Sequence, residues 1–155
     1  MSAEPSPHTR DHRGALPIGL GAVVIALALM AWDHLVGNQR GTDDAFPVDS
    51  PTFFLSAGLI AVAAIVVFGV TVPRSLKNPE SVHRAALIHG VVALVLAVPA
   101  SWLGFPIVVA GGAIALGLQA LDGPHRRVAF AAIALGALVV VFGILGTAFP
   151  PADND

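Results

Sequence analysis

The sequence predicts an all-α integral membrane protein with five transmembrane helices in a small antiparallel bundle. The prediction rests on the scarcity of charge and on the length of the apolar runs. Of the 155 residues, 55% are hydrophobic and only 12% are charged, whereas soluble domains carry about 25% charged residues. The segment 85–121 contains no Asp, Glu, Lys or Arg, and it is too long for one crossing of a bilayer and about right for two.

The composition also excludes several classes of function. The chain has no cysteine, which excludes disulfides, thiolate catalysis, iron–sulfur clusters and cysteine-based zinc sites. Its net charge of −2 provides no basic field for a nucleic-acid partner. All but one of the basic residues are arginine, and alanine and glycine are abundant, as is typical of GC-rich bacterial genomes. We therefore expect a multi-pass protein of a bacterial inner membrane.

The first span is expected at about 15–36, because no charged residue occurs from Ala15 to Trp32. Residues 1–14, which precede it, are polar and contain proline, so we expect a disordered tail. A cleaved signal peptide is the competing interpretation of this region, but the apolar part of a signal peptide is only about 7–15 residues long. Trp32 then falls at the water interface, where tryptophan is favoured.

The second span is expected at about 51–72. It follows an acidic loop that ends in Ser50 and Pro51, a capping side chain before a proline at the first helical position. Pro73 is expected to end this span, because proline lacks the N–H that continues a helix.

The third span is expected at about 79–98, because Asn78 and Pro79 repeat the same start signal. Glu80 and Arg84 then lie four residues apart in the order that favours an ion pair on a helix.

A turn at 99–106, which contains two prolines and two aromatic residues, leads to the fourth span at about 106–121. The sequence Asp-Gly-Pro at 122–124 is a strong stop signal for this helix. The fifth span is expected at about 125–149, and residues 150–155 form a short acidic tail.

The charges agree with five spans and predict the orientation. If 1–14, 73–84 and 122–127 share one side of the membrane, that side holds seven of the eight basic residues. The other side holds only Arg40 but six of the ten acidic residues. The positive-inside rule then places the N-terminus in the cytoplasm and the C-terminus outside it. Four spans would put the short basic loops on opposite sides, so we reject that count.

Each expected span carries small residues at a spacing of three or four. Such stripes allow helices to approach closely in lipid, where no hydrophobic force drives helices together. They have two interpretations: contact surfaces of a compact bundle with or without a face left for a partner, or a chance result of abundant Ala and Gly. The stripes are Ala15, Gly19, Ala22 and Ala26; Ala57, Ala61 and Ala64; Ala86, Gly90, Ala93 and Ala97; Gly111 and Ala115; and Ala132, Gly136, Gly143 and Thr147.

Two polar residues inside the expected spans, His89 and Gln119, are the candidate functional residues. His89 lies five residues after Arg84, about 7–8 Å further along the helix, and ionisable residues within a membrane are functional candidates. If the third and fourth spans fold back on each other about Trp102, His89 and Gln119 lie within about one turn in depth. A hydrogen bond between them is the structural interpretation, and a role in proton relay or ligand binding is the functional one.

No cofactor, metal site or catalytic residue is expected. A buried haem held by two histidines needs a second histidine at the depth of His89, but His34, His83 and His125 fall outside that depth. The acidic loop at 33–50 matches no calcium-binding spacing and is better explained as a solvated loop. Nucleotide-binding, HExxH and GxSxG motifs do not occur in the sequence.

These observations favour a structural or accessory partner in a membrane assembly, with the lipid bilayer and other membrane proteins or further copies of the chain as its partners. The alternative is a component of an oligomeric transporter or channel, with His89 and Gln119 along the path. An enzyme is the weakest of the three classes.

Overall fold

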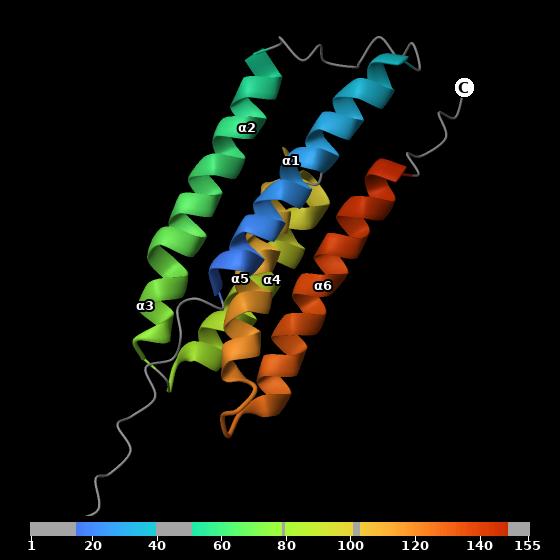
Figure 1. Cartoon of the computed structure of the whole chain (residues 1–155). Helices are drawn as coiled ribbons and strands as arrows, with labels where there is room; N and C mark the ends of the chain where they lie inside the picture. Colours follow the sequence, from blue (N-terminus) through green and yellow to red (C-terminus); the bar gives the residue numbers. More distant parts are fainter. Residues whose placement is uncertain (1–14, 40–50, 79, 101–102, 149–155) are drawn as a thin grey trace, which may run out of the picture.

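The computed structural model describes residues 15–39, 51–78, 80–100 and 103–148. In this part of the chain every regular element is helical, and the helices form five rods in one bundle (Figure 1). The second rod is continuous but has three segments, of which the middle one is a π-helix. The elements are α1 (Ala15–Gln39), α2 (Pro51–Ala64), η2 (Ile65–Thr71), α3 (Val72–Leu76), α4 (Val82–Ala100), α5 (Phe105–Ala120) and α6 (Arg126–Ala148).

Four of the five rods are long and apolar enough to cross a membrane, so the chain is a multi-pass membrane protein. These candidate spans are Ala15–Trp32, Phe53–Leu76, Val82–Ala100 and Arg126–Ala148. The remaining rod, α5, is apolar but has only 16 residues. It is about 24 Å long, shorter than the hydrocarbon layer of about 30 Å. The all-α class and the number of helices are confirmed for the described residues.

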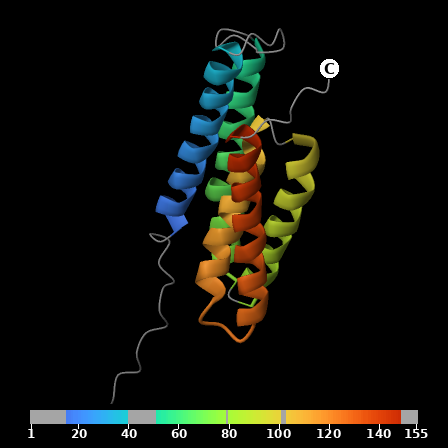
Figure 2. The same ribbon diagram turned by 90° about the vertical axis from the view of Figure 1, so that its right-hand side faces the viewer.

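The short helix α5 lies at the centre of the bundle. Helices α4 and α6 pack along it and against each other, and α1 and α2 also contact it. In Figure 2, α5 (orange) is seen behind α6, between the α1–α2 pair and α4. Every residue from Pro106 to Ala113 is buried, as is the segment 115–117. Most of these residues are small, so the surrounding helices can approach α5 closely.

The small-residue stripes of α1, α5 and α6 lie at these contacts. A Cβ atom at Gly111 would lie 2.5 Å from the Cβ of Ala22 in α1. A Cβ atom at Gly136 of α6 would lie 2.8 Å from the carbonyl oxygen of Ala110 in α5. Both distances are shorter than carbon atoms tolerate, so a larger residue would push the helices apart. These stripes are therefore contact surfaces within the bundle.

Other glycines in the described helices lie away from these contacts. A Cβ atom at Gly21 of α1, Gly58 of α2 or Gly146 of α6 would have nothing within 4 Å. Small residues at these three positions do not serve packing inside the bundle.

The second rod contains a π-helical segment that the sequence analysis does not predict. The Val72 N–H donates to the carbonyl oxygen of Val67, five residues back, and the Thr71 hydroxyl donates to that of Val66 at 2.6 Å. The sequence predicts that Pro73 ends the span, but the helix continues as α3. Proline has no N–H to donate, and here it is the second residue of α3, where the α-helical bonding has only just been interrupted by the π-helix.

The π-helix changes which side chains of the second rod face the bundle. Along this rod Ile60, Val67, Val72 and Leu76 are buried. The step from Val67 to Val72 is five residues, whereas an α-helix returns to the same face after three or four. In an uninterrupted α-helix Arg74, seven residues after Val67, would point into the bundle with it. Because of the longer step, Arg74 is exposed, and the apolar residues two positions before and after it, Val72 and Leu76, are buried.

Helix α4 begins at Val82, three residues later than the sequence predicts. The Asn78 carbonyl oxygen accepts hydrogen bonds from the Ser81 N–H at 3.0 Å and from its hydroxyl at 3.1 Å, which closes a turn before the helix. Glu80 therefore lies in that turn, and within the described residues no ion pair joins it to Arg84. The predicted pair does not form because its first member is not helical.

The connection between α4 and α5 is shorter than the expected turn. Helix α4 continues through Pro99 to Ala100, and α5 begins at Phe105. Gly104, which precedes α5, has a φ of 72°, a left-handed conformation that glycine adopts without steric cost. Trp102 lies outside the described residues.

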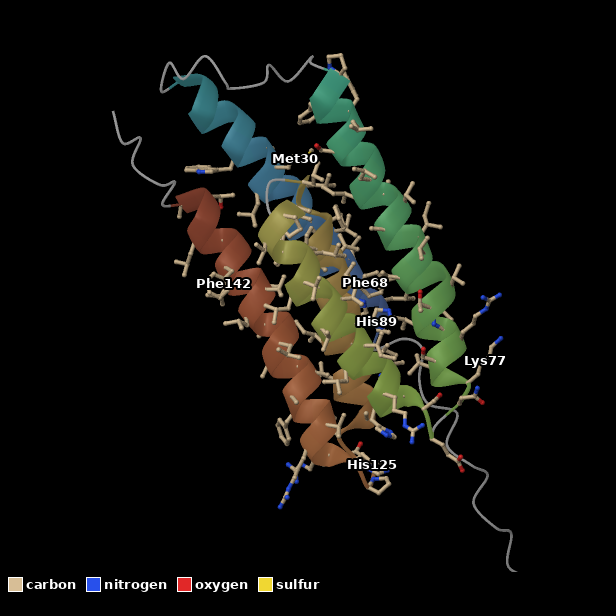
Figure 3. All side chains as sticks on the ribbon, turned by 180° about the vertical axis from the view of Figure 1, so that it is seen from behind. Met30, Phe68, Lys77, His89, His125 and Phe142 are labelled. Carbon is tan, nitrogen blue, oxygen red and sulfur yellow. The ribbon has the colours of Figure 1, made fainter. Side chains whose placement is uncertain are left out.

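The described basic residues gather at one end of the bundle. This end carries α3, the starts of α4 and α6, and the labelled residues Lys77 and His125 (Figure 3). Helix α1 also starts here, because Ala15 and Lys77 line one cavity of about 270 Å³. We call this the basic end; its members are Arg74, Lys77, Arg84, Arg126 and Arg127. The two tails and the loop at 40–50, which complete the charge argument, lie outside the described residues.

Candidate functional site

His89 lies in α4 and is one of two buried polar residues in the described part of the chain, with Ser56 of α2. Its side chain is 9% exposed. The ring atom Nδ1 lies 2.7 Å from the carbonyl oxygen of Ala85, one turn earlier in the same helix. A carbonyl oxygen only accepts hydrogen bonds, so Nδ1 carries the hydrogen and donates it. His89 is thus held by its own helix rather than by a facing polar side chain.

The His89 ring packs where α4, α5 and the π-helix meet. A Cβ atom at Gly112 of α5 would lie 3.1 Å from Cδ2 of His89 and 2.5 Å from Cγ1 of Val67. The next residue of the π-helix, Phe68, packs in the same way on Gly111. Figure 3 shows Phe68 and His89 in the middle of the bundle, away from both ends. The two adjacent glycines of α5 therefore each make room for a side chain of the π-helix and for one from another helix. π-Helical segments are frequent at functional sites.

Gln119 does not lie at the depth of His89. It is half-buried in the last turn of α5, seven residues after the glycine that His89 contacts, which is about 10 Å along the helix. The expected separation was about one turn, and the observed one is about two. His89 lies 11 residues before the end of α4 at Ala100, whereas Gly112 lies seven residues after the start of α5 at Phe105. The two helix ends therefore differ in depth, and His89 faces Gly112 instead of a residue closer to Gln119.

A cavity of about 540 Å³ that several polar side chains line opens at the basic end of the bundle. We call it the histidine pocket, because the rings of His83 and His125 face each other in it. Their centroids are 4.1 Å apart and the ring planes are tilted by 31°. The cavity is lined by Glu80, Ser81, His83 and Arg84 from the start of α4, and by Ala120, Gly123, Pro124 and His125 from the α5–α6 turn.

From the sequence, His83 and His125 are expected only to lie outside the depth of His89, and nothing in it brings them together. They are far apart in the sequence, and only the packing of α4 beside α5 and α6 places them face to face. One signal was available: both histidines are followed by arginine, and both His-Arg pairs stand where a span begins. The same pair occurs a third time, at residues 12–13, just before the first span.

The charged groups around the histidine pocket are one arginine, one glutamate and the starts of two helices. Helices α4 and α6 both begin beside it, and the first N–H groups of a helix have no partner within it and carry partial positive charge. Arg84 lines the pocket. Arg126 lies instead over the ring of Phe130, with its guanidinium carbon 5.2 Å from the ring centroid. Glu80 is the opposing negative charge among the lining residues.

The histidine pocket offers hydrogen-bond donors rather than a set of metal ligands. Among the described residues, no three or more His, Asp or Glu side chains gather as a metal ion requires. Each neutral imidazole offers one N–H donor and each protonated one offers two. The arginine adds a guanidinium group that can bind two oxygens of one anion at once.

No protein-family model, no curated protein and no solved structure matches the chain.

Proposed function

We propose that the protein is an accessory subunit of a membrane assembly and that it binds a transmembrane helix of a partner protein. The observation that carries the proposal is a lipid-facing groove between α4 and α6, beside the start of α5. Its volume is about 450 Å³. The residues that form its walls include Leu94 and Val98 of α4, Ile107 of α5, and Phe142, Gly143 and Gly146 of α6.

The groove differs from the other small-residue surfaces because it is not filled by the bundle. The glycines of α5 and Gly136 of α6 are covered by neighbouring helices. Gly146 has nothing within 4 Å of the position of a Cβ atom, although it lines a cavity with apolar walls. Gly143, three residues earlier, is covered by Ile107 of α5, because a Cβ atom there would lie 2.9 Å from Cδ1 of Ile107. Gly146 is therefore the small residue of this groove that leaves room for the close approach of a further helix in lipid.

A variant that fills the groove tests this proposal. Replacing Gly146 by leucine adds a side chain at a position where no other atom of the bundle lies within 4 Å of a Cβ atom, so we expect the bundle to fold. The leucine would fill the groove, so we expect the partner subunit to be lost. The measurement is purification from native membranes in a mild detergent, followed by mass analysis of subunits present in fixed ratio. Gly21→Leu is the matched control, because Gly21 is equally open but lies on α1.

Two results would contradict the proposal. One is a fixed-ratio subunit that survives Gly146→Leu as well as Gly21→Leu. The other is a pure homo-oligomer that carries ion flux in liposomes, which would support the alternative of a transporter or channel with His89 and Gln119 in its path. That alternative is weaker because the two side chains differ in depth by about two turns and His89 is bonded to its own backbone.

We further propose that the basic end faces the cytoplasm, which places the N-terminus inside and the C-terminus outside. The support is the positive-inside rule together with the gathering of basic residues at one end of the described bundle. Because the chain has no cysteine, single cysteines can be introduced to report the side of each loop. Cysteines at Asp44 and Asp153 are expected to react with an impermeant thiol reagent in intact cells. If cysteines introduced at Lys77 or His125 were labelled instead, the basic end would face outward and the proposed orientation would be wrong.

A further inference from the structure

We propose that the histidine pocket binds a phosphate group, presented either by a lipid headgroup or by a soluble phosphate compound. This inference does not depend on the proposed accessory role, because it concerns the other end of the bundle. It rests on three features of one cavity: facing imidazoles, an arginine, and the starts of two long helices.

The donors converge from two separate elements. His83 and Arg84 come from the first turn of α4, and His125 comes from the residue directly before α6. The rings of the two histidines are 4.1 Å apart, so a single anion can reach both. His83 is half-buried at the start of α4, whereas Arg84 and His125 are exposed at the edge of the cavity, where a ligand can reach them.

Backbone N–H groups at the starts of α4 and α6 add partial positive charge beside the histidine pocket. The carbonyl oxygen of His125 accepts hydrogen bonds from the N–H groups of Val128 and Ala129, and that of Ser81 accepts one from Ala85. The N–H groups that come earlier in each helix have no acceptor within the helix. Helix starts bind anions for this reason, and here two of them border one cavity that also holds positively charged and N–H-bearing side chains.

Phosphate fits this donor set better than a carboxylate or a metal ion. Its several oxygens can accept bonds from two imidazoles and from both arms of a guanidinium at the same time. The cavity of about 540 Å³ also leaves room for part of the group that carries the phosphate. The position at the end of apolar helices is where the phosphates of a bilayer lie.

The test compares binding of inorganic phosphate and of phosphatidylglycerol to the full chain at constant pH and ionic strength. In an uncharged detergent, a titration with inorganic phosphate is followed through the imidazole nitrogen signals, using a purification tag without histidine. We expect His83 and His125 to respond and His89 not to. In parallel, the chain in phosphatidylcholine bilayers with and without phosphatidylglycerol is analysed by native mass spectrometry for retained lipid.

Two variants with opposite expected effects on phosphate affinity make the test specific to the histidine pocket. Arg84→Gln removes a charged donor and is expected to weaken phosphate binding at least about tenfold. Glu80→Gln removes the opposing charge and is expected to strengthen binding about two- to threefold. Arg74→Gln is the matched control, because it removes the same charge from the basic end but does not line the pocket.

Each outcome decides the proposal. Retention of phosphatidylglycerol that Arg84→Gln abolishes supports a lipid headgroup as the source, and binding of inorganic phosphate alone supports a soluble compound. Absence of both in the natural chain overturns the proposal. Equal losses in Arg84→Gln and Arg74→Gln also overturn it, because they would show attraction to the general positive charge and not binding in the pocket.

Discussion

Replacing Gly136 by alanine is expected to destabilise the bundle by about 1–3 kcal/mol, the usual effect of overpacking. Its Cβ atom would lie 2.8 Å from the carbonyl oxygen of Ala110 and 2.9 Å from Cγ1 of Ile114. The first of these is a backbone atom of α5, so relief requires the two helices to separate. In an exposed position the same change would favour a helix by about 0.8–1.0 kcal/mol, and here the contact outweighs that gain.

The free energy of unfolding can be measured by adding SDS to the protein in a mild detergent and following tryptophan fluorescence. Gly21→Ala is the control, since its Cβ atom would meet nothing within 4 Å; it should be as stable as the natural chain or more stable. If Gly136→Ala and Gly21→Ala gave the same stability, α5 and α6 would not be in the close contact described above.

Deleting Gly69 from the π-helix is expected to leave the bundle folded, although removal of one residue from a helix normally ruins its packing. The deletion shortens the step from Val67 to Val72 from five residues to four, which is the repeat of an ordinary α-helix face. The segments before and after η2 would then keep their buried faces, and Arg74 would stay exposed. We expect the free energy of unfolding to stay within about 1 kcal/mol of that of the natural chain, which is the usual effect of changes that conserve packing.

Deletion of Val62 is the matched control. Val62 is exposed and lies in the α-helical part of the same rod, so its loss turns the residues before it by about 100° relative to those after it. Ile60 or Val67 would then leave the bundle, with an expected loss of about 2–5 kcal/mol. A Gly69 deletion as harmful as the Val62 deletion would show that the π-helix is not a one-residue insertion.

The number and approximate bounds of the helices follow from the sequence because each depends on local information. A run without charge and a proline or glycine at its end suffice to locate a span; the fourth was expected at 106–121 and occupies Phe105–Ala120. The third start was displaced because the bonding of Ser81 to Asn78 competes with the helix. Local capping chemistry of this kind is hard to distinguish from a helical first turn in a sequence.

The features that the sequence analysis missed depend on packing between distant segments. The π-helix occurs in an apolar stretch, 65–71, whose residues suit an α-helix equally well, so its cause lies in the neighbours that Val67 and Val72 must reach. The His83–His125 contact joins two separate helix starts. The depth of His89 relative to Gln119 depends on how far the end of α4 extends beyond the start of α5, which packing decides and which moves the facing residue by about one turn.

The short central helix also has a consequence for how the protein is made. With 16 residues, of which several are glycine and alanine, α5 is shorter than a segment that spans a bilayer alone. Its stability in the membrane comes from the helices around it. We infer that α4 and α5 enter the membrane as one unit during synthesis, and that α5 is fully enclosed only after α6 has followed. A chain that stops before α6 would expose the backbone near Gly117 to lipid, because Ala129 and Ile133 of α6 cover it in the finished bundle.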